Sequence, residues 1–435
     1  MSNSLSKLNL LELADNYGTP LYVYDGLKIR EKASLLSKML SEKFNIYYSI
    51  KANPNINILS FIRKHVTGVE AASAGEIFLA LEAGYKPECI IFIGPGKTKE
   101  ELDFAIKNEI GCIVIESIGE LGRIEKIARE MHKKVNIAIR INPSEKSTGA
   151  RFSMSGKATQ FGIDQDDILK LKESMEKLTH VKIIGLHVYY GTQILDYNSI
   201  VENFNHIFKI AESLENSLEI KLELIDFGGG FGIPYFEGED YLNSKLLIEG
   251  LDDIMKKFSS FSDRPMMNLI VESGRFLVGE SGYLITKVIE KKNIKDKTFL
   301  VVDGGSNIHS TAANMGRFIR RNFPIEVIRN NNNNDKYTTE TVNIVGPLCT
   351  PTDILNANVN IPITEVGDYI ILKNSGAYGL SASMISFLSH KVPAEILMIG
   401  RDYHLIRYES EFEDLLLNQP KLFKDNKGES KWKIQ

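Results

Sequence analysis

Short apolar runs alternate with amphipathic segments along most of the chain, and this order predicts a repeating succession of strands and helices. The apolar runs are continuous and rich in valine and isoleucine, which is typical of strands covered on both faces and favours a parallel sheet. Helical patterns such as Ile77–Ala83 and Ile118–Met131 lie between them. The predicted strands are Ile46–Ile50, Val69–Ala72, Ile90–Ile93, Cys112–Ile115, Val135–Ile141, Ile183–Tyr189, Leu222–Phe227 and Leu269–Val271.

Eight such strands, each followed by a helix, predict a (β/α)8 barrel. A doubly wound open sheet is the alternative, although that fold seldom contains eight of these units. Capping boxes mark three helix starts, at Ser73, Thr98 and Ser117, each with a glutamate three residues later. Gly84 and Gly111 stand where the C-caps of two helices are expected.

The pattern changes at the end of this repeat, because later strand patterns follow one another without long helices between them. We therefore predict a barrel over residues 26–280 and a second, mainly β domain over residues 281–435. An isolated strand within Thr19–Asp25 is expected to join that domain, so residues 1–25 are assigned to it. Asn330–Asn334 is predicted to be a mobile loop and Lys424–Gln435 a frayed tail. The other strands predicted there are Tyr283–Ile289, Thr298–Val302, Val342–Val345, Tyr369–Leu372 and Ala394–Ile399.

Composition narrows the function classes. The chain has 435 residues, of which 43% are hydrophobic and 25% charged, with a net charge of -4. That balance gives no reason to expect nucleic acid or an anionic membrane as a partner. No apolar run approaches the ~20 residues that span a bilayer, and the N-terminus lacks the apolar core of a secretion signal. Three scattered cysteines, Cys89, Cys112 and Cys349, predict neither a disulfide framework nor a metal site. We therefore expect a cytoplasmic enzyme.

Lys51 ends the first strand of the predicted barrel, where reacting groups of such barrels gather. A lysine there needs an anionic partner, a depressed pKa or a covalent use as an amine. An aldehyde cofactor offers the covalent use, through a Schiff base. For Lys51 taken alone, an ion pair with a nearby acid is the commoner arrangement, and the choice depends on the rest of the chain.

Two later strand ends carry groups suited to a phosphorylated pyridine. Asp226–Gly232 contains three consecutive glycines, whose backbone N–H groups can cradle a phosphate, although a tight turn is the alternative. Glu272 closes the last strand and Arg275 follows it. A carboxylate facing a pyridine nitrogen would keep that ring protonated, and the arginine suits phosphate. An internal ion pair is an equal alternative for this segment.

The second domain contributes two further candidates. Cys349 lies between turn residues in Gly346–Asp353, which allows a role as proton donor, although a free cysteine is more often a small apolar filler. Tyr378 stands on a glycine turn after a predicted strand.

Seven short motifs, which follow one another in the same order as in a known family, carry a resemblance to that family. The chain resembles the fold-type III pyridoxal-phosphate decarboxylases, the group of the diaminopimelate, ornithine and arginine decarboxylases. The match runs from about Tyr17 to Met398, and any one motif alone would be weak. The motifs are Y-S-I-K-A-N, V-E-A-A-S-A-G-E, H-V-Y-Y-G-T-Q, D-F-G-G-G-F-G, E-S-G-R, G-P-L-C-T-P-T-D and S-G-A-Y-G.

The resemblance implies a role for each matched residue. Lys51 would carry pyridoxal 5'-phosphate as a Schiff base, and Glu272 would pair with the pyridine nitrogen. Cys349 would reach the active site of a partner subunit in a homodimer and protonate the carbanion after carbon dioxide leaves. Glu70, Arg140 and Tyr189 are expected near the cofactor ring. The residues expected to bind the rest of the cofactor, mainly its phosphate, are Thr192, Gly229, Gly230, Gly274, Arg275 and Tyr378.

Departures from the family pattern bear on the substrate. Tyr189 replaces the usual histidine stacked on the ring, and Ser273 replaces a proline. Thr350 stands where diaminopimelate decarboxylases carry a glutamate that holds the distal ammonium. Arg320–Pro324 differs from the arginine-proline-x-x-tyrosine segment that serves the distal carboxylate. The residues predicted to bind substrate are Arg275, Arg320, Thr350 and Tyr378.

These features resemble the subgroup typified by the decarboxylase of butirosin biosynthesis, which acts on a glutamyl group tethered to an acyl carrier protein. We therefore predict an amino-acid α-decarboxylase, with a free amino acid or an aminoacyl carrier protein as substrate. A diaminopimelate decarboxylase making L-lysine is the first alternative. An amino-acid racemase is disfavoured because such racemases oppose the pyridine nitrogen with arginine. A non-catalytic regulator is disfavoured because Lys51 and Cys349 are both kept.

Overall fold

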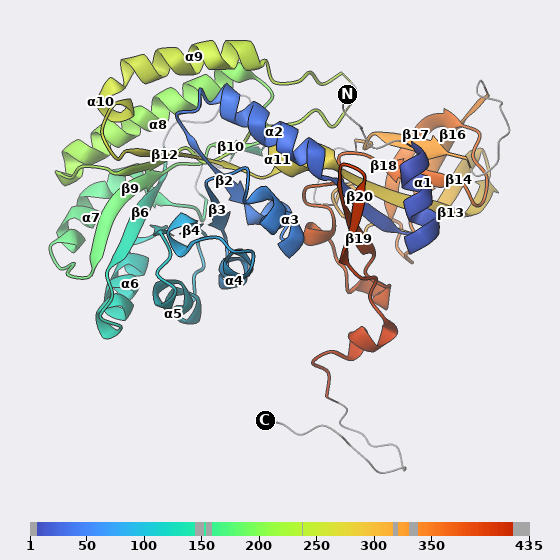
Figure 1. Ribbon diagram of the computed structural model, residues 1–435, viewed down its shortest axis with the longest axis horizontal. Helices are drawn as coiled ribbons and strands as arrows, with labels where there is room; N and C mark the ends of the chain where they lie inside the picture. The colour runs from blue at the N-terminus through green and yellow to red at the C-terminus, as the bar shows by residue number, and fades with distance from the viewer. Residues whose placement is uncertain are drawn as a thin grey trace.

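The computed structural model describes residues 7–143, 152–153, 159–236, 238–315, 321–329 and 338–420. A barrel and a mainly β domain lie side by side in it (Figure 1). Three sequence predictions lie outside the described residues, namely those for Arg320, Asn330–Asn334 and Lys424–Gln435.

In the described part of the chain, eight parallel strands form the barrel, and each pairs with the next in chain order. The sheet is closed because the fourth strand pairs with the fifth and the last pairs with the first. The predicted (β/α)8 barrel is thus confirmed, and the open sheet is excluded. The strands are β2 (Asn45–Ser49), β3 (Gly68–Ala71), β4 (Ile90–Phe92), β5 (Cys112–Ile115), β6 (Val135–Asn142), β9 (Val181–His187), β11 (Leu224–Asp226) and β12 (Asn268–Ser273).

Helices cover the outside of the barrel, and the longer ones bury apolar residues in the core that they share with the strands (Figure 1). In one of them, α6, Leu121, Ile124 and Ala128 recur at helical spacing and are buried. The helices are α2 (Gly26–Met39), α3 (Ile56–Ile62), α4 (Ala74–Glu82), α5 (Lys99–Lys107), α6 (Ile118–Glu130), α7 (Ile168–Met175), α8 (Tyr197–Leu218), α9 (Ser244–Lys257), α10 (Ser259–Ser262) and α11 (Arg275–Val278).

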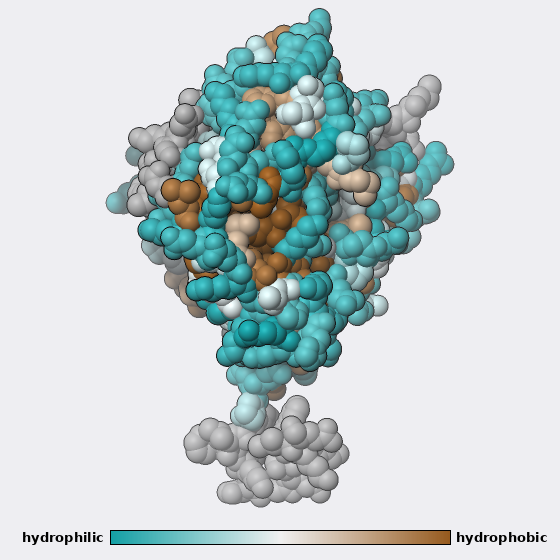
Figure 2. Space-filling model, turned by 90° about the vertical axis from the view of Figure 1, so that its left-hand side faces the viewer, coloured by the Kyte–Doolittle hydropathy of each residue, from teal (hydrophilic) through white to brown (hydrophobic). Residues whose placement is uncertain are grey.

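The barrel interior is filled by residues that alternate along the strands with those facing the helices. Tyr47, Ile91 and Val114 belong to this separate buried cluster. Figure 2 shows the end of the barrel remote from the second domain, where apolar residues occupy a central hollow ringed by hydrophilic ones. That end holds the amino ends of the strands, since a second-domain loop contacts the turn after β2: Tyr378 N donates to Ala52 O at 2.8 Å. The polar residues expected to carry the chemistry lie at the opposite end, where the strands have their carboxyl ends.

The predicted helix ends are partly corrected. Thr98 and Glu101 form a reciprocal capping box. Ser73 and Ser117 cap their helices, but the glutamate side chains reach one residue further back, to Ala72 N and Glu116 N. Gly84 follows its helix with a φ of +85°, as a C-cap glycine does.

Gly111 is not a helix cap. Asn108 caps α5, and Glu109 takes the left-handed conformation there, with a φ of +53°. Gly111 instead lies against the chain before β4, where its N–H donates to Pro87 O and a Cβ would collide with the carbonyl of Glu88. The glycine is required by close packing and not by a helix end.

The second domain is built around a sheet of nine strands among the described residues. The strand after the N-terminal helix, β1, pairs antiparallel with β13 and parallel with β19. Of these elements, α1, β15, β17 and β20 were not predicted. The elements are α1 (Lys7–Tyr17), β1 (Leu21–Asp25), β13 (Gly282–Ile294), β14 (Lys297–Val302), β15 (Ile325–Ile328), β16 (Thr339–Val345), β17 (Ile354–Pro362), β18 (Tyr369–Leu372), β19 (Ala394–Ile399) and β20 (Asp402–Arg407).

Short elements complete the fold at the carboxyl end of the barrel. They are β7 (Phe152–Ser153), β8 (Ile163–Asp164) and β10 (Gly191–Thr192), of which β7 and β10 pair with each other. Across the residues described, no helix combines the length and the apolar character needed to cross a membrane.

Candidate active site

Lys51 lies in the 3₁₀ turn Ile50–Ala52, directly after β2. Its Nζ is 3.0 Å from Oε1 of Glu70, which lies near the end of neighbouring β3 and is buried, while the Lys51 side chain is 42% exposed. Burial lowers the pKa of Lys51, but the charges of Glu70, Tyr378 and Glu272 outweigh burial and raise it above its ordinary value. The ion pair expected for Lys51 taken alone is therefore present, and the amine also opens towards a cavity.

That cavity, here called the cofactor cavity, lies at the carboxyl ends of the strands. Most of the residues predicted to bind the cofactor line it. Arg140 does not, and Glu70 reaches it only through Lys51. The lining residues are Ser49, Lys51, Tyr189, Thr192, Gly229, Gly230, Phe231, Glu272, Ser273, Gly274, Arg275 and Tyr378.

Glycines form one wall of the cofactor cavity because side chains do not fit there. A Cβ at Gly229 would collide with the carbonyl of Glu272. Gly230 has a φ of +106°, and a Cβ there would lie 2.5 Å from the Gly191 carbonyl oxygen. The wall is bare backbone, which is what close approach to a phosphate requires. The tight-turn alternative accounts for neither close approach.

Arg275 and two tyrosines form the adjoining wall. Arg275 begins α11, and its Nη1 donates to the hydroxyl of Tyr235 at 3.0 Å. The guanidinium carbon lies 4.7 Å from the centre of the Tyr378 ring, a cation–π contact. On the other side, Tyr189 is close to Thr192, and burial raises the pKa of Tyr189 to about 12. Tyr235 was not among the predicted site residues.

Glu272, Asp226 and His187 meet on the adjacent strands β12, β11 and β9, and all three are buried. Burial and the charge of Glu272 raise the pKa of Asp226 well above its ordinary value. Burial also acts on Glu272, but His187 and a hydrogen bond from Asp226 outweigh it and lower the pKa to about 2. Glu272 is therefore the carboxylate of the pair, and Asp226 the acid that donates to it.

His187 Nε2 lies 3.5 Å from Glu272 Oε1, longer than a full hydrogen bond. The three side chains offer donor atoms within 4.8 Å of one another, a spacing that a metal ion could bridge. A proton shared between Asp226 and Glu272 explains the closeness of the two acids without an ion. His187 and Asp226 lie within the quoted motifs, but no pattern in the sequence couples them to Glu272.

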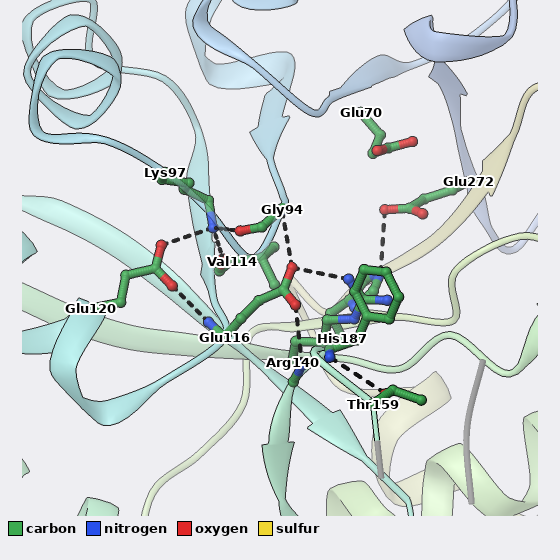
Figure 3. Close-up of polar contacts among 12 residues, drawn as sticks. Glu70, Gly94, Lys97, Val114, Glu116, Glu120, Arg140, Thr159, His187 and Glu272 are labelled. Atoms are coloured by element: carbon green, nitrogen blue, oxygen red, sulfur yellow. Dashed lines mark hydrogen bonds and ion pairs between the residues drawn. The ribbon is translucent and has the colours of Figure 1, made fainter. Parts of the chain in front are cut away.

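Arg140 belongs to a buried ionic network beside the cofactor cavity (Figure 3). Its Nη1 lies 2.9 Å from Oε1 of Glu116, and its guanidinium carbon 4.7 Å from the centre of the Phe161 ring. Lys97 Nζ donates to the Val114 and Gly94 carbonyls, both at 2.7 Å, and to Glu120 Oε1 at 2.8 Å. The network ties together the ends of β4, β5 and β6. Its members Lys97 and Glu120 were not predicted.

Of the candidates from the second domain, Tyr378 lines the cofactor cavity of its own chain, whereas Cys349 and Thr350 do not. Cys349 is exposed, and Thr350 beside it is half-buried. Asp353 holds their loop, because its carboxylate accepts from Leu348 N at 2.8 Å and from Ser306 N at 2.6 Å. These hydrogen bonds hold the loop in place, with the Cys349 thiol exposed at the surface.

The residues that line the cofactor cavity suit pyridoxal phosphate, as their unpartnered polar atoms and their chemistry show. Glu70 Oε2, Glu272 Oε1 and Arg275 Nε are buried without a hydrogen-bond partner among the described residues. Such atoms destabilise a protein unless a ligand satisfies them. A lysine amine, a carboxylate and a glycine wall beside an arginine match an aldehyde, a protonated ring nitrogen and a phosphate.

Comparisons with known proteins agree with this chemistry. The family model described as "Pyridoxal-dependent decarboxylase, pyridoxal binding domain" matches residues 27–279. The chain is 37% identical over 416 residues to the L-glutamyl-[BtrI acyl-carrier protein] decarboxylase of Niallia circulans, covering 96% of this chain and 97% of that protein. It is 32% identical to a diaminopimelate decarboxylase of Zymomonas mobilis, covering 95% of each.

Among solved structures, the diaminopimelate decarboxylase of Helicobacter pylori complexed with L-lysine superposes with a TM-score of 0.82 at 32% identity, covering 94% of this chain and 99% of that one. These relatives confirm the cofactor and the reaction class predicted from the motifs. The chain belongs to the family of pyridoxal-dependent decarboxylases.

Proposed function

We propose that this decarboxylase removes the α-carboxylate of a glutamyl group held as a thioester on an acyl carrier protein. The observation that carries the proposal is Thr350, which stands beside Cys349 where an acid would be needed to hold a distal ammonium. A tethered glutamyl group has no free distal charge, so a neutral hydroxyl suits it. The relative from Niallia circulans carries such a substrate in its name.

In the proposed reaction, Lys51 holds the cofactor and Glu70 accepts the proton of the Lys51 amine. The raised pKa of Lys51 means that the amine is protonated while it faces Glu70. Attack on a carbonyl needs the neutral amine, and the Glu70 carboxylate, 3.0 Å away, is placed to accept the proton.

Glu272 provides a fixed negative charge for the ring nitrogen. When bound, pyridoxal phosphate supplies the electron sink for the electrons left on the α-carbon as carbon dioxide departs. Asp226 keeps its proton and donates it in a hydrogen bond to Glu272, so the negative charge stays on Glu272. Gly229, Gly230 and Arg275 would hold the phosphate at the opposite end.

Cys349 is the proposed proton donor to the α-carbon, acting across a homodimer. The support is its position, because the thiol is exposed on a loop that does not line the cofactor cavity of its own chain. A second copy would bring that loop to the cavity. The thiol proton then moves to the α-carbon after carbon dioxide leaves, and the thiolate regains a proton from solvent.

The test is carbon dioxide release from meso-diaminopimelate, lysine, glutamate and a glutamyl-carrier thioester, measured side by side on the cofactor-loaded protein. We expect the highest kcat/KM for the thioester. A preference for meso-diaminopimelate would overturn the proposal and support a lysine-forming decarboxylase instead. The assay includes meso-diaminopimelate because the Zymomonas mobilis relative is named a diaminopimelate decarboxylase.

A further inference from the structure

A groove of about 1110 Å³ crosses the second domain beside the active site. It is formed by β15 and β17 together with the segments that hold Tyr235 and Phe323, and we call it the second-domain groove. Small-molecule sites have volumes of roughly 300–1,000 Å³, so this groove is larger than a single amino acid needs. The groove has room for a ligand longer than an amino acid.

The inner end of the groove adjoins the cofactor cavity. Tyr235 lines the groove, and its hydroxyl accepts a hydrogen bond from Arg275, which lines the cofactor cavity. The Tyr235 ring packs against Phe323, with the ring centres 5.0 Å apart. A ligand in the groove would therefore end next to the arginine that we assign to the cofactor phosphate.

A buried polar atom in the groove lacks a partner. Asn356 is 1% exposed, and its Nδ2 donates to the Phe323 carbonyl at 2.8 Å. Its Oδ1 is buried with no hydrogen bond to any described residue. An unsatisfied buried acceptor of this kind destabilises a fold, and a hydrogen bond from a ligand N–H would remove that cost. The position calls for a ligand that carries an amide.

The remaining lining is mixed. Asn358 and Asn360 are exposed amides in the same groove, while Phe236 adds an aromatic surface. Arg321 is half-exposed, and its Nη1 pairs with Glu239 Oε1 at 3.0 Å. An anionic group at this point would compete with Glu239 for the guanidinium. The complementary ligand is partly apolar and carries amide groups.

We propose that the second-domain groove binds the phosphopantetheine arm of the carrier protein, whose thioester presents the amino acid to the cofactor cavity. Such an arm has two amides, which suit Asn356 and the other amides of the lining, and an apolar dimethyl segment, which suits its aromatic rings. The inference rests on the proposed function, because a free amino acid would have no arm.

The test uses Val359→Trp, which fills the groove from a lining residue outside the active site. The matched control is Val366→Trp, at an exposed position that is not part of the groove lining. Each cofactor-loaded protein is assayed with a glutamyl-carrier thioester and with the short N-acetylcysteamine thioester of glutamate, which lacks most of the arm. Val359→Trp should lower kcat/KM by about tenfold or more for the carrier substrate, through KM, because remote binding energy is lost. The short substrate and the control should stay within about twofold of wild type.

Equal effects of Val359→Trp on both thioesters, or no effect on either, would overturn the groove assignment while leaving the proposed function intact. A second measurement is independent of turnover: calorimetry with pantetheine 4'-phosphate should show saturable binding to the wild type and the control, and loss of binding in Val359→Trp. Absence of binding to the wild type would also overturn the assignment. If the wild type released carbon dioxide from neither thioester but bound pantetheine phosphate in the groove, the proposed function would fail and the groove assignment would stand.

Discussion

The cofactor cavity and the second-domain groove adjoin through Arg275 and Tyr235 but are built in different ways. The cofactor cavity has a wall of glycines that tolerate no side chain, and charged groups whose partners are fixed by adjacent strands. The groove is open, lined by amides and aromatic rings, and formed by segments distant in the sequence. This difference fits the proposal that the barrel carries the reaction while the second domain selects the substrate.

The largest effect should come from Lys51. Lys51→Ala removes the amine that we propose to hold the cofactor and should lower carbon dioxide release on the order of 10⁴-fold or more. Visible absorbance of the purified protein should change with it, since the covalent link is gone. Turnover within tenfold of wild type would break the assignment of chemistry to the barrel.

Glu272→Gln should have the next largest effect, because a neutral amide cannot keep the ring nitrogen protonated. We expect kcat to fall by roughly 10²–10³-fold, the scale of losing one preorganised electrostatic group. Asp226→Asn is the matched control, since the amide can still donate to Glu272, and it should cost much less. Equal losses in the two variants would argue that the acids serve only to hold the strands together.

Cys349 is the residue that we propose to act across a homodimer. Cys349→Ala should lower kcat by about 10²-fold through loss of a positioned proton donor. Mixing inactive Cys349→Ala and Lys51→Ala subunits should restore roughly a quarter of wild-type activity, because each mixed dimer has one intact shared site. Failure of mixed dimers to regain activity would show that the site is not shared.

Thr350 tests substrate choice without touching the cofactor. Thr350→Glu places an anion where a distal ammonium would bind and should raise kcat/KM for meso-diaminopimelate by about tenfold or more. The thioester should become a poorer substrate in the same protein. Thr350→Ser is the control and should leave both rates nearly unchanged. An unchanged preference in Thr350→Glu would remove the reason for a tethered substrate.

The smallest effect on activity is expected at Glu125, on the outer side of the barrel. Its carboxylate accepts from Thr179 Oγ1 at 2.8 Å and from His180 N at 3.0 Å. Burial raises its pKa, but these and two further hydrogen bonds outweigh burial and lower it to about 2. A depressed carboxyl pKa stabilises the fold above the ordinary pKa and loses that contribution as the pH falls towards the folded-state value.

Glu125→Gln should therefore lower the free energy of unfolding by about 1–3 kcal/mol at pH 7, measured with urea, and by less at pH 3. The kcat should stay close to that of the wild type, since Glu125 does not line the cofactor cavity. A difference in stability that grew on acidification would contradict the hydrogen-bonded carboxylate described here.

The sequence predicted the barrel well and the second domain only in part, for physical reasons. Continuous apolar runs identify strands covered on both faces, so all eight barrel strands were found. Strands such as β17, with several asparagines and a register shift against β16, lack that pattern. The Gly111 prediction was wrong because close packing against Glu88 depends on a neighbour distant in space, which local sequence does not reveal.

The candidate site shows the same contrast. Lys51, Glu272 and Arg275 follow strand ends within short motifs, and the fold brings them into one cavity. Tyr235 lies outside those motifs and reaches Arg275 only through the folding of a long loop. The coupling of Asp226 to Glu272 depends on the pairing of β11 with β12, for which the sequence offers no signal at the level of single residues.

The most direct test of the central claim is to treat the cofactor-loaded wild-type protein with borohydride and map the product by mass spectrometry. The account predicts a single reduced pyridoxyl-phosphate adduct, on the peptide that contains Lys51. An adduct on another lysine, or no adduct on a protein that retains the cofactor, would contradict it.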